Sequence, residues 1–178
     1  DVDEAATDDA WLASFFQGTF YEIDPDDGSY TELPEPDSSS IDDLGNTPSL
    51  ASSIHGSGGI AYAYDGTNDR LLMLDVCEED LTEVGESGIN SSCGMAIGPD
   101  GELYGINSNT DTLVVFDRSD GSASEVGSLG LEVMNCALTY DCATDTLVGM
   151  HIEPDDGVGV LFSIDASTGA MTEEVELD

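Results

Sequence analysis

The chain has 178 residues, the length of about one domain. Its 39 acidic side chains are opposed by only two arginines and no lysine, for a formal net charge of −37. This composition excludes direct contact with nucleic acid or with an anionic membrane surface, because both bind through clustered lysine and arginine. No run of about 18 apolar residues is present, so the sequence offers no transmembrane helix.

Four strings of the chain share one pattern: an apolar residue, two variable residues, an apolar residue and an aspartate. These copies are residues 20–24, 71–75, 113–117 and 161–165. A glycine follows four residues after the aspartate in every copy except the second, where Glu79 stands, and a Thr-Glu or Ser-Glu pair comes next. The pattern predicts a β-hairpin in which a strand ends at the aspartate, the Asp and Gly form the turn, and a second strand returns.

Further strands are expected before each hairpin. They are residues 93–97 and 103–106 in the third copy, 136–140 and 147–150 in the fourth, and 11–16 and 60–63 as second strands of the first two. The repeated aspartates recur every 42 to 51 residues. Four strands in about 40–50 residues is the spacing of β-propeller blades.

We therefore predict an all-β fold, a β-propeller-type array of about four antiparallel four-stranded blades with an incomplete first blade. Residues 1–10 form an acidic N-terminal segment, and residues 11–178 form a single propeller-like domain. Its blades are expected at about 11–36, 50–88, 92–130 and 135–177. Too little chain precedes residue 11 for an inner strand, so we count about 15 strands.

Two stretches resemble the blades of secreted microbial β-propellers, which carry repeats of the form LYGI…LxxIDxxTGxxTxVG. They are residues 103–127 and 161–169. The resemblance covers about residues 11–177 and implies an antiparallel all-β fold. It implies no particular chemistry, because many unrelated propellers share such blades.

The incomplete first blade leaves a sheet edge uncovered, next to an aromatic stretch with Trp11, Phe15 and Phe16. Three arrangements would cover this edge: a compact ring with an irregular first blade, a longer propeller of which this chain is part, or blades supplied by another chain. The expected partner is another copy of the chain or another part of a parent protein. Association should strengthen with salt, which screens the like charges.

Four cysteines, Cys77, Cys93, Cys136 and Cys142, occur without a C-x-x-C motif, so a zinc site is poorly supported. Their even number favours an oxidising, extracellular or cell-surface location, with free thiols as the alternative. Cys93 and Cys136 begin equivalent strands, so they are the predicted pair if one disulfide exists. Asn90 begins an N-glycosylation sequon and is a glycosylation candidate.

Two acidic turns are candidate calcium-binding sites. The candidate ligands are Asp24, Asp26, Asp27, Asp155 and Asp156. Neither turn has the alternating ligands of a calcium loop, so we interpret both first as turns and leave calcium open. His55 lies in a Gly/Ser-rich loop and His151 continues a strand, and no catalytic constellation or other cofactor motif emerges.

The sequence thus favours a non-catalytic extracellular propeller module that acts in binding or as a self-assembling structural subunit. The alternatives are a propeller-based enzyme, such as a hydrolase or a lyase with or without a metal, and a fragment of a larger propeller protein. An even spread of acids without lysine is also typical of a salt-adapted surface, with a merely acidic secreted protein as the other interpretation.

Overall fold

The computed structural model describes residues 11–14, 20–24, 27–32, 49–52, 59–75, 80–98, 100–153 and 157–177. These residues form four antiparallel sheets, which we call blades 1 to 4. Blade 1 contains β1 (Trp11–Ser14), β2 (Phe20–Ile23) and β3 (Tyr30–Glu32), and blade 2 contains β4 (Ser49–Ser52), β5 (Ile60–Asp65), β6 (Arg70–Asp75) and β7 (Asp80–Glu86). Blade 3 contains β8 (Gly94–Ile97), β9 (Leu103–Asn107), β10 (Thr112–Phe116) and β11 (Ala123–Ser128), and blade 4 contains β12 (Ala137–Asp141), β13 (Thr146–Ile152), β14 (Gly159–Ile164) and β15 (Met171–Glu176).

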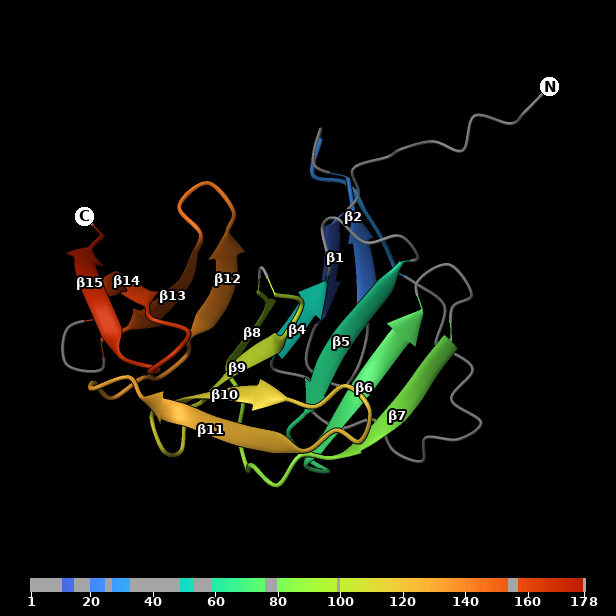
Figure 1. Ribbon diagram of the computed structural model, residues 1–178. Coiled ribbons are helices and arrows are strands. Elements are labelled where there is room, and N and C mark those ends of the chain that lie inside the picture. The colour runs from blue at the N-terminus through green and yellow to red at the C-terminus, as the bar shows by residue number, and fades with distance from the viewer. Residues whose placement is uncertain are drawn as a thin grey trace.

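The blades follow one another along an arc, and each blade pairs its strands in chain order (Figure 1). The first strands of blades 2, 3 and 4 are neighbours, because β8 contacts both β4 and β12. This arrangement confirms the predicted propeller-type array. The described residues include no helix that is long and apolar enough to cross a membrane.

Blade 1 has three described strands, as the sequence predicts. The repeated aspartate Asp24 follows β2, just as its counterparts follow β6, β10 and β14. Strand β2 is therefore the third strand of its blade, and β1 pairs with it as the second strand. The strand that corresponds to β4, β8 and β12 is the one that blade 1 lacks among the described residues.

The aspartate–glycine hairpin has the same backbone geometry in its three described copies. The N–H of Gly121 donates to the carbonyl of Asp117 at 2.8 Å, and the N–H of Asp117 donates to Ser122 at 2.8 Å. The same pair of bonds recurs around Asp24 and Asp165. Gly121 has a φ of 83°, a left-handed conformation that glycine adopts without strain. The repeated pattern therefore encodes this turn.

Successive blades pack through alternating faces of their third strands. In β10, Leu113 faces blade 4 and is buried with Ile106 and Phe162. Phe116, from the other face of β10, is buried against Tyr64 and Leu71 of blade 2. Blade 3, which lies between two other blades, thus has one apolar face toward blade 4 and another toward blade 2.

Glycines in the outer strands allow the next blade to approach closely. A Cβ at Gly85 would overlap the carbonyl of Asp120 in the β10–β11 turn, and a Cβ at Gly127 would overlap the carbonyl of Thr168 in the β14–β15 turn. Backbone bonds accompany this approach, since the N–H of Met171 donates to the carbonyl of Leu129 at 3.2 Å. The blades are therefore joined by main-chain contacts as well as by side chains.

We expect Gly127→Ala to lower the free energy of unfolding by about 1–3 kcal/mol, because the new methyl group would push against backbone that cannot rotate away. Urea denaturation followed by circular dichroism measures the loss. Ser124→Ala, an exposed change on the same strand, is the matched control and should stay within about 0.5 kcal/mol. Equal effects of the two changes would contradict the close blade contact.

Candidate functional site

The calcium candidates lie in turns where the structure describes them. The N–H of Ser29 donates to Oδ1 of Asp27 at 2.7 Å, and hydrogen bonds from the Ser29 hydroxyl and N–H lower the pKa of that carboxyl. Asp24 precedes this turn at the end of β2. Asp26, Asp155 and Asp156 lie outside the described residues. Within the described ranges, no group of three or more His, Cys, Asp or Glu side chains is arranged to hold a metal ion.

The aromatic edge predicted for blade 1 is described only in part. Trp11 begins β1, where its backbone lies opposite Ile23 of β2. Phe15 and Phe16 fall outside the described residues, as does His55. The glycosylation candidate Asn90 is exposed in the segment that connects blades 2 and 3.

Cys93 and Cys136, the pair that the sequence singles out, form a disulfide with their Cα atoms 5.1 Å apart. Each residue immediately precedes the first strand of its blade, β8 or β12, so the bond ties blade 3 to blade 4. Both side chains pack against the apolar core between these blades. Cys142 is a free, exposed thiol in the β12–β13 turn. Cys77 lies outside the described residues.

His151 is buried on β13, where its ring contacts Phe162 edge to face at 5.7 Å between centroids. Its Nδ1 atom has no hydrogen-bond partner. No described nucleophile or acid hydrogen-bonds to this nitrogen, so His151 joins no catalytic constellation within the described residues. It contributes instead to the packing between blades 3 and 4.

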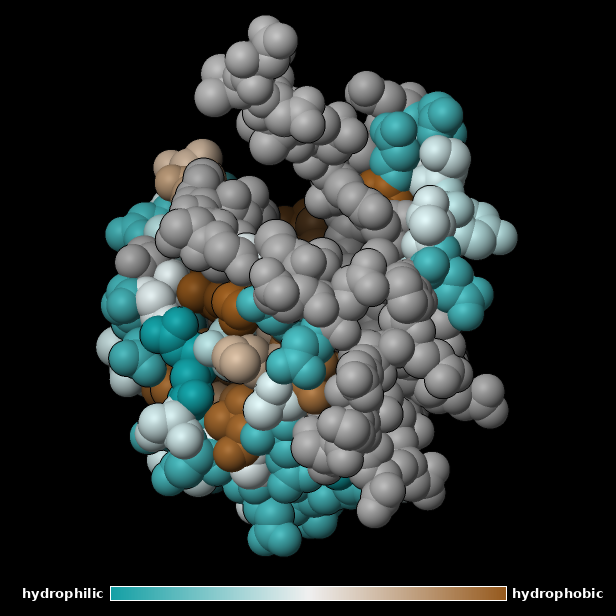
Figure 2. Space-filling model, turned by 90° about the vertical axis from the view of Figure 1, so that its right-hand side faces the viewer, coloured by the Kyte–Doolittle hydropathy of each residue, from teal (hydrophilic) through white to brown (hydrophobic). Residues whose placement is uncertain are grey.

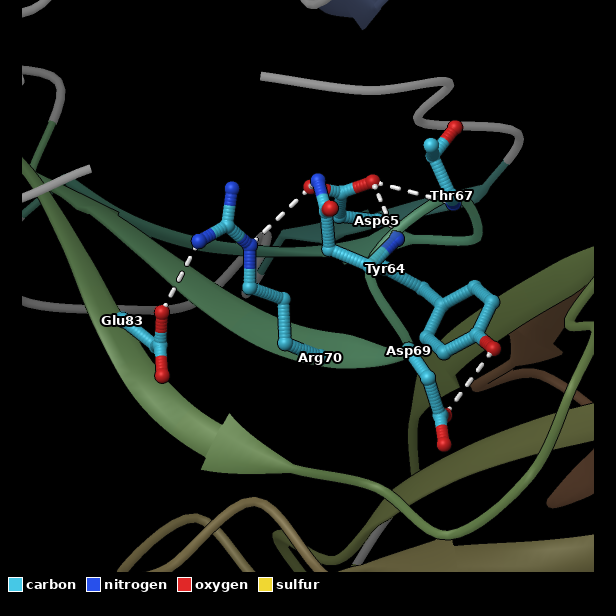
Figure 3. Close-up of polar contacts among 7 residues, drawn as sticks. Tyr64, Asp65, Thr67, Asp69, Arg70 and Glu83 are labelled. Carbon is cyan, nitrogen blue, oxygen red and sulfur yellow. Dashed lines mark hydrogen bonds and ion pairs between the residues drawn. The ribbon is translucent and has the colours of Figure 1, made fainter. Parts of the chain in front are cut away.

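Arg70 is the centre of a buried polar network at the β5–β6 hairpin (Figure 3). Its Nε donates to Oδ2 of Asp65 at 3.0 Å, and its Nη1 donates to Oε2 of Glu83 at 2.9 Å. The Asp65 side chain has no exposed surface, while that of Arg70 is 10% exposed. Asp65 also accepts from the N–H of Thr67 at 3.1 Å. Because its oxygens are occupied by donors, Asp65 serves as a structural carboxylate.

A second set of bonds ties the same hairpin to the segment that connects blades 2 and 3. The hydroxyl of Tyr64 donates to the carbonyl of Ile89 at 2.6 Å and to Oδ1 of Asp69 at 3.3 Å. Ser87 donates its hydroxyl to the same Asp69 oxygen at 2.5 Å. Burial raises the pKa of Tyr64, so its hydroxyl remains a donor at neutral pH. Figure 3 shows Tyr64 and Asp69 pointing toward one another.

The other arginine lies at a groove of about 550 Å³. Its lining residues come from β5 of blade 2 and from blade 3; they are Tyr62, Glu102, Val115, Asp117, Arg118, Ser119 and Ser124. Arg118 is exposed in the β10–β11 turn. The hydroxyl and N–H of Ser119 donate to Asp117 at 2.6 and 2.8 Å and lower its pKa, which favours the ionised carboxylate. The groove therefore offers a cation, carboxylates and hydroxyls together.

Neither the Arg70 network nor the groove was predicted in detail from the sequence. A signal for the network was present, since Asp65 and Arg70 flank a four-residue polar turn between two apolar strings. The groove had a weaker signal. Arg118 is one of only two residues of the Lys/Arg type, and it lies in a repeated turn. The sequence does not show which residues of the neighbouring blade this turn lies close to.

Salt should stabilise the folded chain, because both ion pairs among the described residues belong to Arg70 while the net charge is −37. In Figure 2, hydrophilic described residues surround a smaller group of hydrophobic ones. We expect the melting temperature to rise by about 5–10 °C between about 10 mM and about 1 M KCl, since dissolved ions screen repulsion between surface carboxylates. Scanning calorimetry tests this, and an unchanged melting temperature would show that repulsion does not limit stability.

Comparison with known proteins supports the fold. No protein-family model and no curated protein matches the sequence. Among solved structures, the chain is similar to the nidogen–laminin complex (TM-score 0.62, 13% identity, covering 96% of this chain and 77% of that chain). It is also similar to an auxiliary nutrient binding protein from Bacteroides thetaiotaomicron (0.61, 12%, covering 99% and 40%).

A third similar structure is hydrazine synthase from Kuenenia stuttgartiensis (TM-score 0.57, 15% identity, covering 99% of this chain and 53% of that chain). The chain therefore spans about half of the hydrazine synthase chain and less than half of the nutrient binding protein. WD40 repeats of RRP9 are similar as well (0.56, 11%, covering 94% and 47%). At these identities the likeness shows the fold alone, a β-propeller repeat array.

Proposed function

We propose that the chain is a non-catalytic, extracellular β-propeller module of the secreted microbial type that acts in binding. The observation that carries this proposal is the groove between blades 2 and 3, whose lining includes Arg118, Asp117 and Tyr62. Concave surfaces with a few convergent polar groups are the usual form of a small-molecule site. The similarity to a nutrient binding protein agrees with a binding role.

The ligand class that suits the groove is a neutral, polyhydroxylated molecule such as a short saccharide. A guanidinium and a carboxylate each engage two adjacent hydroxyl groups through paired hydrogen bonds. The protein's charge of −37 repels anions. Within the groove, Arg118 can donate hydrogen bonds while Glu102 and Asp117 can accept them, so an uncharged ligand with both donors and acceptors matches the lining.

The extracellular part of the proposal is supported by the Cys93–Cys136 disulfide, since such bonds persist in oxidising compartments. Asn90 is exposed, as a glycosylated residue must be. Within this role the module also acts as a structural subunit, whose partner is another copy of itself or another part of a parent protein.

An array of neutral and acidic oligosaccharides, probed in high salt with the labelled protein, tests the proposal. We expect binding to neutral members, a loss of about 10-fold or more in Arg118→Met, and unchanged binding in Glu132→Gln, an exposed control between blades 3 and 4. Absence of any neutral ligand, or equal binding by Arg118→Met, would overturn it.

A further inference from the structure

Blade 4 carries an apolar row that corresponds to the row of blade 3 buried between blades 3 and 4. In blade 3 the row that faces blade 4 runs across the sheet in register as Gly94, Ile106, Leu113 and Gly127. Ile106 and Leu113 are fully buried there by blade 4. Every blade that is followed by another blade needs such a row, because it forms the contact between them.

The corresponding row of blade 4 is Ala137, Met150, Leu161 and Val175. All four are apolar, in a chain where about one residue in five is acidic. Ala137 is exposed, Met150 and Leu161 are half-buried, and Val175 is 59% exposed. The row thus keeps the composition of a blade-to-blade contact while no described blade covers it.

The opposite end of the arc carries the complementary face. Tyr21 and Ile23 of β2 occupy the positions of Val114 and Phe116 in β10, which face the preceding blade. Tyr30 lies opposite Ile23 in register and is 71% exposed. Its counterpart in blade 2, Leu81, lies opposite Leu74 and is fully buried.

These blade 1 residues form an apolar depression of about 370 Å³ lined by Tyr21, Ile23, Gly28 and Tyr30. The two tyrosine rings meet edge to face at 5.6 Å between centroids. In blade 3, Gly127 leaves room for the next blade's turn, whereas blade 4 has Val175 at that position. The depression has the size and polarity to receive the Val175 side chain.

We infer that the Ala137–Val175 row of blade 4 docks onto the Tyr21–Tyr30 face of blade 1 in a second copy of the chain. The two faces lie on blades at the two ends of the arc in Figure 1, so a twofold axis places each blade 4 against the other copy's blade 1. Two arcs of four blades then close one ring, and no apolar end face stays exposed. The chain spans about half of the hydrazine synthase chain that it matches, so a pair supplies a comparable length.

The inference rests on the assembly part of the proposed function and is independent of the groove. Self-repulsion between two chains of charge −37 opposes the contact, and salt relieves it. The dimer should therefore tighten as ionic strength rises. The dissociation constant of an apolar interface between uncharged chains would change little with ionic strength.

Sedimentation velocity in about 3 M and about 0.1 M KCl, after alkylation of free thiols, tests the inference. We expect a dimer in high salt. Val175→Glu and Tyr30→Glu should each weaken it by about 30-fold or more, because each puts a charge into an apolar contact. Ala143→Glu, an exposed turn residue outside both faces, adds the same charge and should leave the dimer intact.

Mixing the two weakened variants gives the sharpest result. Val175→Glu keeps an intact blade 1 face and Tyr30→Glu keeps an intact blade 4 face, so the mixture retains one good contact and should dimerise more tightly than either variant alone. A monomeric parent chain at high salt, open-ended oligomers, or dimers that ignore both changes would overturn the inference. Saccharide binding by the Val175→Glu monomer would show separately whether the groove is functional.

Discussion

Replacing Arg70 with methionine is expected to lower the free energy of unfolding by about 3–5 kcal/mol. The change removes the donor that lies 3.0 Å from Oδ2 of Asp65, whose side chain has no exposed surface. A carboxylate left in the interior without its cation keeps its full desolvation penalty, and methionine fills the space without supplying a proton donor. Urea denaturation in about 1 M KCl measures the loss, which should persist in salt because a buried pair is screened little.

The chain contains its own control for charge, since Arg118→Met removes the only other basic residue from an exposed turn. That change should stay within about 0.5 kcal/mol. The double variant Asp65→Asn, Arg70→Met should recover part of the loss, because the amide carries no charge to leave unpaired. If Arg70→Met and Arg118→Met lowered the free energy of unfolding equally, the loss would come from the change in net charge and not from the buried pair.

The repeated turn explains why so much of the fold could be predicted. A strand ends at each repeated aspartate, and Gly121 and Gly169 adopt the left-handed conformation that the turn requires. Because this chemistry is local, four copies in register predicted four blades. Among the described residues blade 1 has three strands, in agreement with the predicted incomplete first blade.

The polar network could not be predicted, because it depends on contacts between strands. The pairing of Arg70 with Glu83 joins β6 to β7, and a bulge shifts the register of these strands between Leu71 and Leu72. A sequence pattern does not reveal the shift. The groove likewise combines Tyr62 of blade 2 with Arg118 of blade 3, and only the packing of the two sheets brings them together.

The end faces were beyond prediction for a different reason. Leu113 and Leu161 occupy the same position of the repeat, yet Leu113 is fully buried and Leu161 is only half-buried. Both positions have the same residue type, and the difference in burial comes from whether a described blade packs against them. The predicted edge at Trp11 concerned the first strand that blade 1 lacks among the described residues, whereas the exposed apolar side chains belong to blade faces at both ends of the arc.

Removal of the Cys93–Cys136 disulfide should cost about 2–4 kcal/mol of stability. The bond spans 43 residues and joins the starts of β8 and β12, so it restricts the unfolded chain over most of blade 3. The double variant Cys93→Ala, Cys136→Ala tests this by urea denaturation without leaving an unpaired thiol. Cys142→Ser is the matched control, because Cys142 is free and exposed, and it should stay within about 0.5 kcal/mol.

Peptide mapping of the oxidised protein addresses the same bond chemically. Cys136 and Cys142 flank β12, so a six-residue extended segment holds them about 20 Å apart, far beyond disulfide range. Mapping that links these two would show that β12 is assigned wrongly. If the disulfide and the Arg70 network act as described, each stabilises a different set of strands: the disulfide joins β8 to β12, and the network joins β5, β6 and β7. Their losses should then add within about 0.5 kcal/mol in the combined variant, because the two sites share no partner.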